Sequence, residues 1–120
     1  MCLGLAAPLL SMYFVVGLCS QAPDSTSKTS LEHFRAGESL FAEDHYQAAA
    51  LEFFAALKGD LQPKWIQVWS HVELGKIFDV TLQRDRAVRE YRLAQETNDN
   101  TRGALDEAAK YLKEPFQRKN

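Results

Sequence analysis

The feature that most constrains this chain is a pattern of small and large residues that occurs twice, 38 residues apart. In each copy a glycine precedes an alanine by 12 residues, an aromatic residue follows four positions later, and another alanine three after that. Small residues let two helix axes cross closely, and the aromatic ring fills the space beside the crossing. The pattern predicts an all-α fold, an antiparallel array of helix hairpins. The matching residues are Gly37, Leu40, Ala49, Phe53 and Ala56 in the first copy, and Gly75, Phe78, Ala87, Tyr91 and Ala94 in the second.

Apolar residues three and four positions apart predict the helices within this array. Ser30 is expected to cap the first helix, Gly59 to end the second in a left-handed conformation, and Pro63 to lie in the first turn of a long third helix. A closing amphipathic helix should cap the array. The predicted helices are 31–42, 46–57, 63–80, 86–97 and 101–113, within a domain of residues 31–114; residues 115–120 form a tail whose end, 117–120, should be frayed.

These residues resemble the tetratricopeptide repeat (TPR) family. Its pattern of Leu-Gly, a large residue, Ala, an aromatic residue and Ala is present as Leu74-Gly75-x-x-Phe78 and Ala87-x-x-x-Tyr91-x-x-Ala94. The sequence departs from the family in its 38-residue spacing, in histidines at an aromatic position, and in lacking a closing proline after the second copy. The excess length is expected in a longer connection and a longer third helix. The alternative is a generic array of α-helical hairpins with the same architecture.

The first 23 residues carry no charged side chain. Residues 1–22 are expected to be a signal peptide or an N-terminal membrane anchor, and residues 23–30 a flexible linker. A third alternative is a bacterial lipoprotein with Cys19 as its lipidated residue. The sequence favours an exported bacterial protein, periplasmic or membrane-anchored, over a cytoplasmic one, and the membrane is contacted only through this segment.

Composition and spacing argue against catalysis. The net charge of −2 gives no general affinity for nucleic acid. The three histidines lack the spacing of a zinc motif, and Ser70 beside His71 has no orienting acid at a telling distance in the sequence. Arginines from Arg84 to Arg92 alternate with acids, which is typical of a solvated helix face. We expect no enzyme activity, no cofactor and no metal.

The resemblance implies that the first helix of each pair lines a concave groove for a protein or peptide partner. Carried over by position, the lining would be Leu31, Phe34, Glu38 and Phe41 in the first copy and Trp69, Val72, Lys76 and Asp79 in the second. The predicted function is a non-catalytic interaction module or scaffold, exported or membrane-tethered. The alternative is a structural segment that associates with itself, or a fragment of a larger repeat protein.

Overall fold

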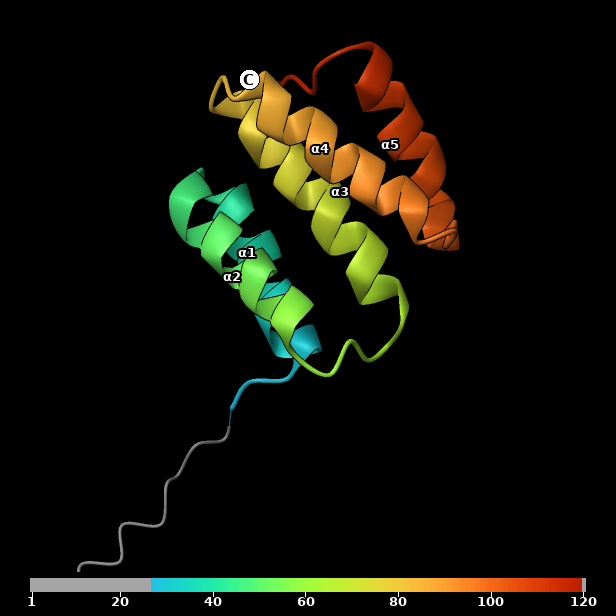
Figure 1. Cartoon of the computed structure of the whole chain (residues 1–120). Coiled ribbons are helices and arrows are strands. Elements are labelled where there is room, and N and C mark those ends of the chain that lie inside the picture. Colours follow the sequence, from blue (N-terminus) through green and yellow to red (C-terminus); the bar gives the residue numbers. More distant parts are fainter. Residues whose placement is uncertain (1–26, 120) are drawn as a thin grey trace, which may run out of the picture.

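The computed structural model describes residues 27–119, and within that range all regular structure is helical. The predicted all-α array of hairpins is therefore confirmed (Figure 1). The predicted signal peptide, Cys19 and residues 23–26 of the predicted linker lie outside the described residues. The helices are α1 (Ser30–Ala42), α2 (Tyr46–Lys58), α3 (Trp65–Val80), α4 (Arg84–Glu96), the 3₁₀ turn η1 (Thr101–Gly103) and α5 (Ala104–Lys113).

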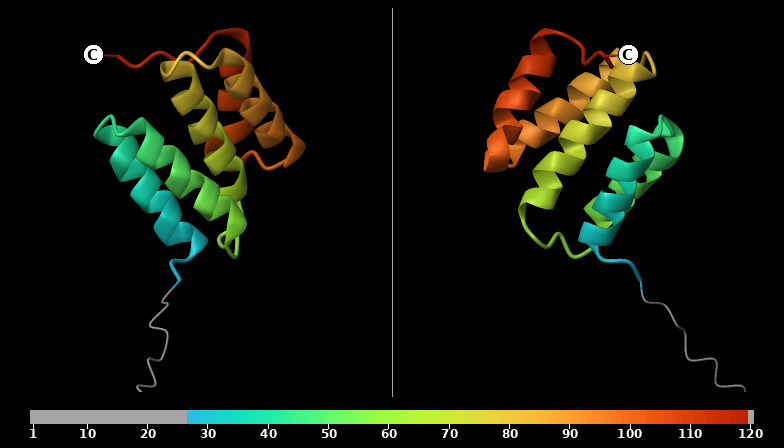
Figure 2. Two further views of the ribbon diagram at one scale, coloured as in Figure 1. Left: turned by 60° about the vertical axis from the view of Figure 1, so that its left-hand side comes forward. Right: turned by 180° about the vertical axis from the view of Figure 1, so that it is seen from behind.

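Helix α3 is the centre of the molecule. It pairs with α4 as α1 pairs with α2, and it also contacts α1, α2 and α5 (Figures 1 and 2). Because neighbours cover it on several sides, α3 is apolar around most of its circumference and contributes more buried residues than any other described helix. Helices α1, α3 and α5 form one side of the array, which is the side on which the predicted groove would lie.

Each hairpin closes where a glycine meets an aromatic ring. A side chain added at Gly75 would collide with the ring of Tyr91, whose Cδ1 atom would be 2.6 Å away, and one added at Gly37 would be 2.9 Å from Cε1 of Phe53. Real Cβ atoms essentially never come so close to another atom. Both rings are fully buried. The two glycines are thus required for close approach of the paired helices, as the sequence predicted.

The first helix begins one residue earlier than expected, and Ser30 is not its cap. Thr29 caps α1, and Glu32 completes a capping box with it. Ser30 is buried instead and donates a hydrogen bond to the Ala56 carbonyl at 2.7 Å, at the end of α2. The left-handed conformation predicted for Gly59 is also wrong, because its φ is −85° and the chain leaves α2 in an extended conformation beside Ser30.

Other boundaries shift for local reasons. Pro63 precedes α3, which starts at Trp65 and is 16 residues long against 13 for α1, so the longer third helix is confirmed. Helix α5 starts three residues later than predicted, because Arg102 and Gly103 have positive φ values of 57° and 76° that interrupt the helix. In residues 27–119 no helix combines the length and the apolar composition that crossing a bilayer requires.

Candidate functional site

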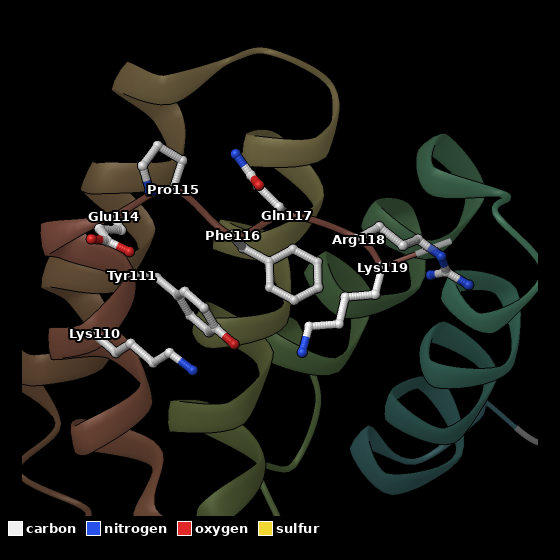
Figure 3. Close-up of a pocket in the computed structure, with 8 residues that line it drawn as sticks. All are labelled: Lys110, Tyr111, Glu114, Pro115, Phe116, Gln117, Arg118 and Lys119. Carbon is white, nitrogen blue, oxygen red and sulfur yellow. The ribbon is translucent and has the colours of Figure 1, made fainter.

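The C-terminal segment, residues 114–119, lies across the side of the molecule on which the groove was predicted. After α5 the backbone becomes extended at Glu114, and the chain then crosses α3 and reaches the end of α1 (Figures 2 and 3). The segment was expected to be frayed from residue 117 onward. That prediction is wrong for the described residues 117–119, because Arg118 is held by hydrogen bonds to α1.

Phe116 is the first anchor of the segment. Its ring packs edge-on against Tyr111, with centroids 5.2 Å apart, and lies 6.1 Å from the ring of Phe41. Its main-chain N–H donates a hydrogen bond of 2.8 Å to Oδ2 of Asp79. Figure 3 shows this ring between Tyr111 on one side and Arg118 and Lys119 on the other, while Gln117 points away from it.

Arg118 is the second anchor. Its guanidinium donates hydrogen bonds to the carbonyl oxygens of Phe41 at 2.8 Å and Ala42 at 2.9 Å. Its Nε atom lies 2.8 Å from a carboxylate oxygen of Asp44, and the cationic plane lies 5.1 Å from the centre of the Phe41 ring. The last carbonyls of a helix lack partners within the helix and carry partial negative charge. Arg118 therefore satisfies the open end of α1.

Lys76 on α3 lies among aromatic rings of α3, α5 and the C-terminal segment. Its ammonium group is 2.8 Å from Glu73 and 3.2 Å from Glu107, and it lies within 6 Å of the ring centres of Trp69, Tyr111 and Phe116. Burial opposes its charge, but the carboxylates of Glu73 and Glu107 outweigh that effect and raise the pKa of Lys76. Burial also raises the pKa of Glu73, against the influence of Lys76. Lys76 thus presents a fixed positive charge to the aromatic rings around it.

Asp79 joins α3, α4 and the C-terminal segment. Its side chain is fully buried, and Arg84 donates hydrogen bonds of 3.0 Å to both of its oxygens. Tyr91 donates a third bond at 2.9 Å. Arg84 also donates to the carbonyls of Tyr111 and Leu112 at the end of α5. The sequence had placed Arg84 on a solvated face, and this is a correction: it joins the polar network because α5 returns beside it.

Seven of the eight predicted groove residues fall into three groups, and the eighth, Leu31, is partly buried against the hydrophobic core. Phe41, Lys76 and Asp79 contact the C-terminal segment. Phe34, Glu38 and Trp69 line a separate shallow pocket of about 290 Å³ with Trp65, Glu73 and Arg102, while the indole N–H of Trp69 donates to the Thr101 carbonyl at 2.9 Å. Val72 is fully buried in the core and does not reach the groove surface, because neighbouring helices enclose this part of α3.

The prediction missed the residues that dock the C-terminal segment, namely Tyr111, Phe116 and Arg118, and the acids beside them, Asp44, Glu73 and Glu107. The signal available in the sequence was the pairing of an aromatic residue and an arginine two positions apart, directly after Pro115. Alternate residues of an extended segment point to the same side, so this spacing fits two anchors on one surface. Only the fold of the other helices reveals that surface, so the signal could not be interpreted alone.

The histidines that were compared between the copies both pair with glutamates. Nδ1 of His33 lies 2.7 Å from Glu52, and Nδ1 of His71 lies 2.8 Å from Glu90. Each pair spans 19 residues and joins the two helices of its hairpin. The hydroxyl of Ser70 is buried, and within the described residues it has no hydrogen-bond partner, so it does not extend the second pair into a catalytic triad.

A second hollow, of about 860 Å³, lies on another side of the molecule between α2, the end of α3 and the start of α4. It contains Leu51, which is 68% exposed, together with Phe54. Arg86 also lines the hollow, and its guanidinium lies over the ring of Phe78, 4.0 Å from the ring centre. In the part of the chain that the structure describes, no three side chains of the metal-binding types gather into a cluster.

Comparisons with models of protein families, with curated proteins and with solved structures found no match.

Proposed function

We propose that this protein is a non-catalytic interaction module whose groove between α1, α3 and α5 binds an extended segment of a partner protein. The observation that supports it is the C-terminal segment, which lies in this groove with one side chain among aromatic rings and one main-chain N–H on a carboxylate. A surface that accepts a peptide of its own chain in this manner has the chemistry to accept one from another chain. The repeated Gly-to-Ala crossing supports a TPR-like module as the scaffold.

We also propose that the module is exported or held at a membrane. This rests on the uncharged, mostly apolar residues 1–22, which precede a polar stretch. The mass of the mature N-terminus, measured separately in membrane and soluble fractions of the native cell, tests it. Recovery of an intact, unmodified chain in the soluble fraction alone would contradict the proposal.

Site-specific photo-crosslinking in the native cell tests the proposed groove. A photoreactive amino acid would replace Glu38, which is exposed and lines the shallow pocket that Glu73 shares with the groove, and a matched one would replace Arg92, which is exposed on α4. A discrete adduct is expected from position 38 and not from position 92. Adducts from position 92 alone, or from neither position, would count against the groove.

The alternative is a structural role through self-association, and the exposed Leu51 is the observation that favours it. Association through the hollow beside Leu51 would bury that side chain against a second copy. Light scattering over a range of concentrations distinguishes the two functions. A mass that stays at that of the monomer removes this alternative, whereas a mass that rises with concentration and is reduced by Leu51→Glu supports it.

A further inference from the structure

We infer that the ligand of the groove is an extended peptide segment in which an aromatic residue is followed, two positions later, by an arginine, and that the C-terminal segment is an internal copy of this ligand. The inference rests on the proposed function of the groove and adds the chemistry of the partner. Three subsites on the groove define that chemistry, and each is occupied by residues 116–118.

The first subsite takes an aromatic ring. Phe116 lies between Tyr111 and Phe41, and the ammonium of Lys76 is 5.6 Å from its ring centre. Lys76 is held there by the carboxylates of Glu73 and Glu107, so the charge is in place independently of the ring. An aliphatic side chain would fill the space but would lose the attraction between the cation and the ring face.

The second subsite takes one main-chain N–H. The acceptor is Oδ2 of Asp79, whose carboxylate is already oriented by Arg84 and by the hydroxyl of Tyr91. Because this carboxylate accepts a hydrogen bond from the main chain, it fixes the register of the peptide and does not select a side chain.

The third subsite takes a guanidinium. Two carbonyl oxygens at the end of α1, the carboxylate of Asp44 and the face of Phe41 surround Arg118. Several acceptors in different directions, with a ring beneath, suit the planar fork of arginine better than the single ammonium of lysine. The subsite should therefore distinguish these two residues.

The remaining residues of the segment point to a displaceable ligand. Gln117 and Lys119 are exposed, while Phe116 and Arg118 are half-buried. Only alternate side chains are therefore engaged, as in an extended peptide docked on a surface. A segment attached by a short tether competes at an effective concentration on the order of millimolar, so a partner must bind more tightly than the segment does or act when the segment is released.

Fluorescence anisotropy with a labelled peptide of residues 113–120 tests the inference on the full chain. The peptide is expected to bind the double variant Phe116→Ala/Arg118→Ala at least about tenfold more tightly than the native chain, because the internal competitor is weakened. Gln117→Ala is the matched control and should behave like the native chain. A peptide with alanine at the Phe116 position and lysine at the Arg118 position should not bind either protein.

Arg118→Ala alone is the second variant, since it alters a partly exposed side chain at the edge of the molecule and should keep its native circular dichroism. Equal affinity for the native chain and for a folded variant, or no binding to a folded variant at millimolar peptide, would overturn the inference. The crosslinking test separates the two failures. An adduct at position 38 with no peptide binding leaves the groove in place and rejects this ligand class, whereas loss of both rejects the proposed function as well.

Discussion

The main-chain N–H of Phe116 donates a 2.8 Å hydrogen bond to the carboxylate of Asp79, which precedes it by 37 residues. The carboxylate is buried and also accepts bonds from Arg84 and Tyr91. The side chain of Asp79 on α3 therefore connects α3 with the start of α4, with the middle of α4 and with the C-terminal segment.

The amide of Phe116 should exchange slowly with solvent, because its hydrogen must leave a buried acceptor before exchange. The neighbouring amide of Gln117 is the control, since its side chain is exposed and the described structure shows no acceptor for its N–H. Hydrogen exchange followed by NMR measures both in one sample. Arg118→Ala should reduce the protection of Phe116 severalfold; equal exchange at Phe116 and Gln117 in the native chain would show that the segment is not docked.

Gly75→Ala should destabilise the protein, although glycine to alanine in a helix ordinarily stabilises it by about 0.5–1 kcal/mol. The added methyl group would meet the buried ring of Tyr91, and we expect a net cost of about 1–3 kcal/mol in the free energy of unfolding. Gly37→Ala is the matched comparison, with a smaller cost because the nearest atoms of Phe53 lie at 2.9–3.0 Å. Urea denaturation measures the free energy of unfolding of both variants. A Gly75→Ala protein more stable than the native chain would contradict the close approach of α3 and α4 at this glycine.

The pair of His71 and Glu90 should contribute more than its counterpart in the first hairpin. Its side chains are 14% and 10% exposed, against 23% and 24% for His33 and Glu52, so solvent screens it less. Double-mutant cycles to alanine should give a coupling free energy of about 1–2 kcal/mol for the second pair and below about 1 kcal/mol for the first. A larger coupling free energy for His33 and Glu52 than for His71 and Glu90 would show that burial does not decide which pair is stronger.

Stability should fall at alkaline pH through Tyr91. Burial, followed by the hydrogen bond to Asp79 and the charge of that carboxylate, raises the pKa of this phenol above its ordinary value. The folded chain therefore binds the phenolic proton more tightly than the unfolded chain does. The resulting stabilisation is complete below about pH 10, the pKa of an unperturbed tyrosine, and is lost progressively as the pH rises above it.

Tyr91→Phe tests this pH dependence. The variant should lose about 1–2 kcal/mol of stability at neutral pH, because Asp79 loses one buried donor. Above pH 10 its free energy of unfolding should fall less steeply than that of the native chain, by up to about 1.4 kcal/mol per pH unit. Chemical denaturation at several pH values measures the slopes. Identical slopes in the two proteins would assign the alkaline transition to other groups.

The hairpins were predictable because their signal is local. The spacing of Gly75, Ala87 and Tyr91 indicates which residues of two neighbouring helices pack together. The structure has these contacts, so packing elsewhere in the molecule did not change the predicted hairpin. Helix ends were less predictable. The start of α5 depends on positive φ values at Arg102 and Gly103, and the cap of α1 on whether Thr29 or Ser30 meets the end of α2.

The site was predictable only in part. Phe41, Lys76 and Asp79 were predicted to share one surface because the repeat pattern identifies one face of α1 and α3, and all three contact the C-terminal segment. The docking of the C-terminal segment on that surface was not predicted, because Arg118 is held by the carbonyl of Phe41, 77 residues earlier in the chain. No sequence pattern within this short segment predicts a contact with a residue so distant in the chain. Arg84 and Val72 were misplaced for a related reason, since α5 and the neighbouring helices cover surfaces that a single hairpin would leave open.

Mapping the peptide of residues 113–120 by amide chemical shifts on the Phe116→Ala/Arg118→Ala chain tests the central claim most directly. The claim predicts that the shifted amides cluster around Phe41, Lys76, Asp79 and Tyr111, and that the peptide leaves those around Leu51 and Phe54 unchanged. Shifts confined to the hollow beside Leu51, or no shifts at millimolar peptide, would contradict it.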